Sequence, residues 1–203
     1  MAIKPVYLVA GFGRCGLTAT MQMLWYGGAP VAGTYPAFED QRFGVANPDP
    51  VWISQQHGKV VKYVDPSVNR LPAAITAKTV WLDRAPDEQA KSMLKLVSDS
   101  GLPAPRAAIK AMAGSLRKQR AGTVEALRRH GPVMQVTFQD LVSQPYETAS
   151  RIIRFFGATV FPDPVIGSQI ILRRSPTCAP DMEIEMRAMA AAQSLRGRSG
   201  AAL

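Results

Sequence analysis

The chain has 203 residues, 47% of them hydrophobic, which is enough for one α/β domain with a sizeable core. No segment approaches the roughly 18 consecutive apolar residues of a transmembrane helix, and the amino terminus lacks the layout of a signal peptide. We therefore expect a cytoplasmic protein that is not associated with a membrane. The net charge of +9 favours an anionic partner, such as a nucleotide, a sulfated or phosphorylated substrate, or a nucleic acid.

Predicted strands and helices alternate along the first half of the chain. An apolar run predicts a strand at residues 6–10, and a helix is expected at residues 16–25. Residues 29–58 contain prolines and scattered aromatic residues, which predicts loops and short elements. Strands are expected at residues 59–64 and 79–83, and Asp65 is expected to cap a helix that begins near Pro66. A further helix is expected at residues 86–97, with two acidic residues in its first turn.

The second half of the chain continues this alternation. A long basic helix is expected at residues 106–130, a strand at residues 133–138 and a helix at residues 145–156. Strands alternating with helices predict an α/β fold, a three-layer sandwich with a central, mainly parallel sheet, like that of the P-loop NTPases. We expect one domain at residues 1–196 and a disordered tail at residues 197–203.

The basic helix carries much of the excess positive charge. Its basic residues are opposed by the single acid Glu125, and they are Arg106, Lys110, Arg117, Lys118, Arg120, Arg128 and Arg129. They form either a solvated helix face or a surface for an anionic partner. Aromatic side chains that would stack on bases are missing from this segment, which makes nucleic acid an unlikely partner.

A glycine-rich turn follows the first predicted strand and leads into the first helix. The turn reads Gly-Phe-Gly-Arg-Cys-Gly-Leu-Thr at residues 11–18 and nearly satisfies the phosphate-binding pattern G-x-x-x-x-G-K-[ST]. Leu17 stands where that pattern has lysine, and Arg14 supplies a cation three residues earlier. Backbone N–H groups of such a loop converge on an anion. For Cys15, a small side chain that fits a tight turn is favoured over an activated thiol. Cys15 and Cys178 have no metal-site spacing, and no metal is expected.

Two further segments also carry recognisable patterns. A strand ends at Arg84 and a serine, Ser92, follows eight residues later. Another strand leads into an aromatic-x-Asp-Leu turn at residues 138–141 and a helix that ends in Phe-Phe-Gly at residues 155–157. Together with the loop, these segments resemble the sulfotransferases that use 3′-phosphoadenosine 5′-phosphosulfate (PAPS). Lys62 and Pro66 are loosely similar to a Lys-x-Pro segment of several members.

The resemblance implies a function and a set of site residues. It implies transfer of a sulfuryl group from PAPS to an unknown hydroxyl or amine acceptor. The residues that would hold the 5′-phosphate are Gly11, Gly13, Arg14, Cys15, Gly16, Leu17 and Thr18. Arg14 would stabilise charge on the leaving oxygen, and Arg84 and Ser92 would hold the 3′-phosphate. The catalytic base is left open between Glu39, the adjacent Asp40, and His57. Arg173-Arg174 is either a cover for the nucleotide or a solvated pair.

The loop departs from the family pattern, and two other functions remain open. Gly13 replaces the usual proline, Cys15 a serine and Leu17 a threonine. One alternative is a nucleotide kinase or NTPase that uses Mg-ATP, with Asp83 and Thr18 on the metal. Another is a protein that binds a nucleotide without turnover. The acceptor is expected to be anionic if the positive surface binds it, and the long helix is compatible with a homodimer.

Overall fold

A parallel sheet of four strands runs through the centre of the protein, in a computed structural model that describes residues 4–40, 49–97 and 104–171. The strands are β1 (Val6–Gly11), β2 (Val60–Val64), β3 (Ala77–Asp83) and β4 (Val133–Thr137). They lie in the order β2-β1-β3-β4, and every neighbouring pair is parallel. The carboxyl ends of the four strands therefore meet at one edge of the sheet, where folds of this kind bind their ligands.

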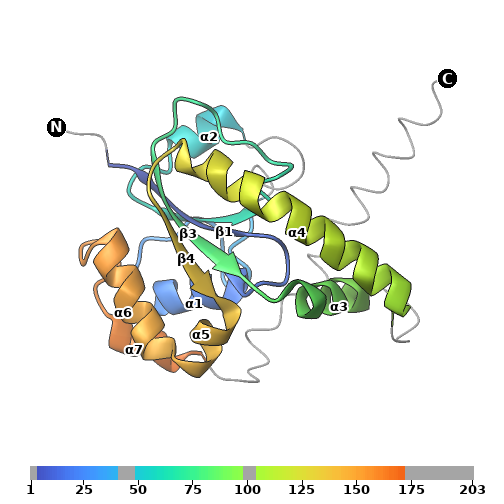
Figure 1. The fold of residues 1–203 in the computed structure, drawn as a ribbon. Coiled ribbons are helices and arrows are strands. Elements are labelled where there is room, and N and C mark those ends of the chain that lie inside the picture. The colour runs from blue at the N-terminus through green and yellow to red at the C-terminus, as the bar shows by residue number, and fades with distance from the viewer. Residues whose placement is uncertain (1–3, 41–48, 98–103, 172–203) are drawn as a thin grey trace.

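Helices cover both faces of this sheet (Figure 1). On one face lie α1 (Leu17–Tyr26), α5 (Phe138–Ser143), α6 (Pro145–Phe156) and α7 (Pro164–Gln169). On the other lie α2 (Pro50–Ser54), α3 (Pro86–Val97) and α4 (Arg106–Arg128). The predicted three-layer α/β sandwich with a parallel sheet is confirmed. Within the described ranges, no helix combines the length and the apolar composition needed to cross a membrane.

The central strand β1 shows why the sheet has a core on each side. All six of its residues are buried, as expected for a strand of a parallel sheet covered on both faces. Tyr7 and Val9 belong to the cluster that includes side chains of α1 and α6. Leu8 and Ala10 belong to the second cluster, with side chains of α3 and α4. The alternation of side chains along one strand thus joins both helical layers to the sheet.

The structure corrects the expected helix after β2. Asp65 has a φ of +49°, in the left-handed region, whereas a helix N-cap is normally extended. The backbone forms a single turn, in which the N–H groups of Val68 and Asn69 donate to the Asp65 carbonyl. The Asp65 side chain instead accepts a hydrogen bond from Gly13. The N-cap prediction was therefore wrong because this carboxylate is used by the loop after β1.

Two short helices, α5 and α7, were not predicted. α5 begins directly at the end of β4, where the Thr137 side chain accepts the N–H of Asp140. α7 begins in the same way, with Asp163 accepting the N–H of Ile166. Both caps follow the general rule that Thr and Asp satisfy the first free amides of a helix. The expectations for Arg173-Arg174, for Cys178 and for the tail at residues 197–203 lie outside the described residues.

Candidate active site

The loop between β1 and α1 lies at the carboxyl edge of the sheet. Two of its residues have positive φ angles, Arg14 at +68° and Gly16 at +102°. Successive peptide units turned in this way form concave nests of N–H groups that attract anions. Gly16 has little space for a side chain, because a Cβ atom there would lie 2.9 Å from the Phe138 ring. The loop therefore contains left-handed turns of the kind from which such nests are built, and Gly16 stands where the backbone leaves little space for a side chain.

Side chains from two neighbouring elements hold this loop. Gln89 of α3 is buried, and its amide donates to the carbonyl oxygens of Phe12 and Gly13 at 3.2 and 2.8 Å. Asp65 accepts the Gly13 N–H at 3.1 Å. Proline, which the resembling family has at this position, could not make this bond, since it has no N–H to donate. Gly13 was predicted to help hold a phosphate, but its N–H cannot serve a phosphate while it is bonded to Asp65.

The three residues predicted to bind the donor and its 3′-phosphate come together in space. Arg14 donates from Nε to the Ser92 hydroxyl at 3.0 Å, although the two are 78 residues apart. Arg84 donates from Nη1 to the Arg14 carbonyl at 3.1 Å. The loop, the end of β3 and helix α3 therefore place two guanidinium groups and a hydroxyl in one cluster. Such a cluster can bind a phosphate through charge-assisted hydrogen bonds.

The guanidinium of Arg84 is fixed on several sides. It stacks on the Phe138 ring at 4.4 Å from the ring centroid, and its Nε lies 3.6 Å from Glu88. Arg120 of α4 donates to the Arg84 carbonyl at 2.8 Å and pairs with Asp83 at 2.7 Å. Stacking on an aromatic ring restricts an arginine without using its N–H donors. Arg84 is therefore preorganised, and a helix from the second layer contacts the turn that carries it.

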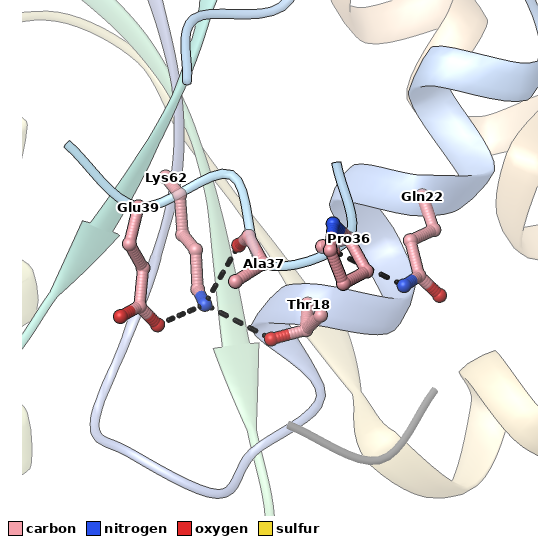
Figure 2. A network of polar contacts seen from close by, with 6 residues as sticks. All are labelled: Thr18, Gln22, Pro36, Ala37, Glu39 and Lys62. Atoms are coloured by element: carbon pink, nitrogen blue, oxygen red, sulfur yellow. Dashed lines mark hydrogen bonds and ion pairs between the residues drawn. The ribbon is translucent and has the colours of Figure 1, made fainter. Parts of the chain in front are cut away.

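Lys62 is a buried residue beside the loop that the sequence analysis did not place among the site residues. Its side chain is 3% exposed and lies on β2, directed toward α1 (Figure 2). The ammonium donates to the Thr18 hydroxyl at 2.9 Å and to the Ala37 carbonyl at 3.0 Å, and it forms an ion pair with Glu39 at 2.5 Å. A lysine inside an otherwise apolar strand was the signal available in the sequence, because lysine is rarely buried without a partner.

This contact places a lysine ammonium beside the loop although the loop lacks one. The phosphate-loop pattern has its lysine at the position of Leu17, and here Leu17 is buried in the core. The ammonium of Lys62 arrives from the neighbouring strand and touches the next residue, Thr18. A lysine ammonium is therefore present at the end of the loop, but it originates elsewhere in the chain and is paired with Glu39.

Glu39 and His57, the candidate bases, are in different places. Glu39 lies beside Lys62 and has 27% of its side chain exposed. The segment before it is held by Gln22 of α1, whose amide donates to the Pro36 carbonyl at 3.1 Å (Figure 2). His57 lies near the amino ends of the strands, opposite the loop, where its Nδ1 is 2.7 Å from the carbonyl oxygen of Lys4, before β1 begins. The length of β1, about 20 Å at the usual rise per residue, separates it from the loop. The structure therefore does not support His57 as the base.

Asp40, the third candidate, lies in the wall of an open hollow beside the edge strand β2. The hollow has a volume of about 250 Å³ and lies between the segment that precedes Asp40 and the end of α2. Its lining residues are Val31, Ala32, Gly33, Asp40, Trp52, Gln55, Gln56 and Lys59. Because Asp40 adjoins Glu39 in sequence, this polar hollow is close along the chain to the Lys62 pair.

The thiol of Cys15 is not an activated nucleophile. Burial raises the pKa of Cys15 strongly, and the charges of Asp65 and Asp83 raise it further, whereas backbone N–H groups of the loop oppose this. The side chain is fully buried. The favoured interpretation, that Cys15 is a small residue filling the turn, agrees with this environment. Asp65 and Asp83 therefore lie close enough to the loop for their charges to act on it.

Asp83 and Thr18, the residues that a Mg-ATP enzyme would place on its metal, both face cations. Asp83 is paired with Arg120, and the Thr18 hydroxyl accepts from Lys62. In a P-loop NTPase these positions hold Mg²⁺. A metal at either position would have to replace a positively charged side chain or lie against it. The arrangement therefore favours a site for a metal-free anion over a site for a metal–nucleotide complex.

The fold is a three-layer α/β sandwich with a glycine-rich loop after its first strand. No protein-family model and no curated protein sequence matches the chain. Among solved structures, the chain is similar to mouse sulfotransferase SULT7A1 complexed with PAP, with 12% identity and a TM-score of 0.53. The match covers 83% of this chain and 64% of the mouse chain. This likeness confirms, for the fold, the resemblance predicted from the sequence.

Two bacterial structures also match over most of this chain. The sulfotransferase from Alicyclobacillus acidocaldarius is 14% identical, with 94% of this chain and 92% of that chain covered and a TM-score of 0.47. Sulfotransferase STF1 from Mycobacterium tuberculosis H37Rv is 15% identical, with 94% and 77% covered and a TM-score of 0.46.

Proposed function

We propose that this protein is a sulfotransferase that moves a sulfuryl group from PAPS to a hydroxyl or amine acceptor. The observation that carries the proposal is the Arg14–Ser92–Arg84 cluster. It unites the loop with the end of β3 and with α3 through bonds of 3.0 and 3.1 Å. A donor with two separate phosphate groups needs a cationic site for the second one, and this cluster supplies it beside the loop. The mouse protein of similar fold was crystallised with PAP.

Each residue of the donor site has a distinct role in this proposal. The loop amides and the start of α1 hold the 5′-phosphate, and Thr18 adds its hydroxyl. Arg84 and Ser92 hold the 3′-phosphate, with Arg84 kept in place by Phe138. Arg14 lies between the two groups because it is part of the loop and also reaches Ser92. Its guanidinium stabilises charge that develops on the phosphate oxygen during transfer.

The acceptor side is assigned to the Lys62–Glu39 pair. When bound, the donor supplies a sulfuryl group whose bond to the phosphate oxygen breaks as its bond to the acceptor oxygen or nitrogen forms. The acceptor must lose a proton in this exchange, and Glu39 is the carboxylate that accepts it. One ammonium group joins Glu39 to Thr18 at the loop, with contacts of 2.5 and 2.9 Å. Lys62 thus orients the base and connects it to the loop.

The acceptor itself is assigned only by chemical class. The net positive charge of the chain suits an anionic acceptor. A homodimer and a cytoplasmic location remain part of the proposal. They would be tested by sedimentation of the purified protein and by fractionation of cells.

A binding experiment tests the donor site without knowledge of the acceptor. Adenosine 3′,5′-bisphosphate (PAP), AMP, Mg-ATP and a short DNA duplex would be compared by thermal shift and by calorimetric titration. PAP is expected to bind more tightly than AMP, because only PAP engages Arg84 and Ser92. Arg84→Ala should weaken PAP binding by about tenfold or more, as expected for the loss of a charge-assisted hydrogen bond, and leave AMP nearly unchanged.

Arg128→Ala is the matched control, since Arg128 lies at the far end of α4, is 55% exposed and forms a surface ion pair with Glu125 at 3.3 Å. It should leave both affinities unchanged. Equal losses for PAP and AMP in Arg84→Ala would mean that Arg84 is structural. A preference of the unaltered protein for Mg-ATP would replace the sulfotransferase proposal with a phosphotransferase. DNA binding that falls steeply with salt, without any response to PAP, would favour a non-catalytic protein.

A further inference from the structure

The basic helix α4 contributes one side chain to the edge of the donor site. Arg120 reaches the end of β3, where its Nη2 lies 2.7 Å from the Asp83 carboxylate and 2.8 Å from the Arg84 carbonyl. About three quarters of each side chain of this ion pair is shielded from solvent, since Arg120 is 26% and Asp83 27% exposed. Arg117, one turn earlier, pairs with Asp87 instead and is 53% exposed. Arg120 is thus distinct from its neighbour on the same helix.

Asp83 is poorly placed for a protein that binds a polyanion. It ends the strand next to β1, and its negative charge adds to burial and to Asp65 in raising the pKa of Cys15 in the loop. An ionised carboxylate beside the loop opposes the entry of phosphate, because like charges in a partly buried site are only weakly screened. The same carboxylate would attract Mg²⁺, which holds nucleotides in the NTPases of this fold. The charge of Asp83 must therefore be compensated, by a metal or by a side chain.

We propose that Arg120 is the specificity-determining residue that makes this loop a metal-free anion site. Its guanidinium occupies the place at Asp83 that a metal ion would take, and it cancels the charge that would repel the donor. By bonding the Arg84 carbonyl as well, it fixes the turn that carries the 3′-phosphate ligand. The inference rests on the proposed function, because it assumes that the loop binds the phosphates of the donor.

Four variants separate this role from a general effect on folding. Arg120→Gln keeps a hydrogen-bonding side chain and removes the charge, whereas Arg120→Lys keeps the charge. Asp83→Asn and the double variant Asp83→Asn/Arg120→Gln remove the carboxylate. Arg117→Gln is the matched control on the same helix. Circular dichroism and melting curves would first show that each variant is folded. Binding of PAP and of inorganic pyrophosphate would then be measured by titration, once in the presence of EDTA and once in the presence of about 5–10 mM Mg²⁺.

If Arg120 compensates the charge of Asp83, the affinities of the variants should follow a specific pattern. Arg120→Gln should weaken metal-free binding of PAP and pyrophosphate by about tenfold, or about 1.4 kcal/mol. Arg120→Lys and Arg117→Gln should stay close to the unaltered protein. Asp83→Asn/Arg120→Gln should recover the lost affinity, because the repelling carboxylate is gone. Mg²⁺ should strengthen pyrophosphate binding in Arg120→Gln more than in the unaltered protein, and this gain should vanish in the double variant.

Other patterns overturn the inference. Unchanged affinity in Arg120→Gln, or a loss that Asp83→Asn does not repair, would show that Arg120 does not act by compensating Asp83. A strong Mg²⁺ requirement of the unaltered protein would contradict the metal-free site. If the unaltered protein binds pyrophosphate and not PAP, the sulfotransferase proposal fails. The pyrophosphate affinities of the Arg120 variants then still test the role of Arg120. If it binds neither anion, both proposals fail.

Discussion

Replacement of Lys62 by methionine tests the polar cluster next to the loop. Methionine keeps the length of the side chain and its apolar stem but removes the ammonium. The change deletes the contacts with Thr18, with the Ala37 carbonyl and with Glu39, at 2.9, 3.0 and 2.5 Å. It leaves a carboxylate and a carbonyl that no longer receive their hydrogen bonds from this side chain. We therefore expect Lys62→Met to destabilise the fold.

The size of the effect follows from the burial of the two partners. Removing one member of a fully buried ion pair costs about 3–5 kcal/mol, because the other charge is left uncompensated. Lys62 is 3% exposed, but Glu39 is 27% exposed and can regain part of its hydration. We therefore expect the free energy of unfolding to fall by about 2–3 kcal/mol. The melting temperature should fall by about 2–4 °C for each kcal/mol in a domain of this size.

Urea unfolding followed by circular dichroism measures this loss, with the requirement that the m-value stays unchanged. The double variant Lys62→Met/Glu39→Gln is the sharper measurement. The glutamine at position 39 is neutral and needs no ammonium partner. The double variant should therefore lose less free energy of unfolding than the two single variants lose together. The coupling energy in the cycle should be about 1–2 kcal/mol.

Two results would refute this reasoning. A loss below about 0.5 kcal/mol in Lys62→Met would mean that the ammonium contributes no more than an ordinary surface charge. Strict additivity in the cycle would mean that Lys62 and Glu39 do not interact in solution. Either result would also remove the support for Glu39 as an oriented base.

Two further predictions concern the loop and its carboxylate. Gly13→Pro should lower the free energy of unfolding by about 1–3 kcal/mol, because Asp65 loses the N–H that donates to it. Gly13→Ala should be nearly neutral, since no atom lies within 4 Å of the new Cβ. Equal urea midpoints for the two variants would contradict this. Burial raises the pKa of Asp65, so the folded protein favours its protonated form, and the contribution of Asp65 to stability should be greatest at acid pH and decrease as the pH rises through the pKa of the folded state. Asp65→Asn should remove this decrease, whereas Asp140→Asn on α5 should retain it, as measured by urea unfolding between about pH 4 and pH 8.

The parts of the fold that sequence could predict are those with a strong local pattern. The apolar run of β1, the glycine-rich turn and the helix after it follow from neighbouring residues, and β1, α3 and α6 have the predicted types. The placement of Arg84 and Ser92 beside the loop, where both contact Arg14, was available from the spacing of a known family. In each case, the signal lies within a segment of a few residues, where backbone preference and periodicity act directly.

The parts that sequence could not predict depend on contacts across the sheet. Asp65 appeared to be a helix cap because Asp before Pro usually is one, but its partner is 52 residues away in Gly13. Lys62 appeared to be one polar residue in a strand, and its three partners come from two other segments. No local preference specifies either contact. They follow from the parallel order of β2 beside β1, which brings the ends of both strands to one edge.

The same strand order explains how a loop with an altered motif is surrounded by polar groups from other segments. Leu17 lacks the ammonium or the hydroxyl that the two loop patterns have at its position, and Gly13 replaces the usual proline; Lys62 donates to Thr18, and Asp65 uses the N–H that proline would lack. The compensating groups lie on β2 and after it, beside the strand that leads into the loop. A departure from the motif therefore changes which segment provides a charge, and the edge of the sheet determines where that charge is placed. For a loop of this kind, the charges that surround it in space are a better guide to its ligand than the letters of its motif.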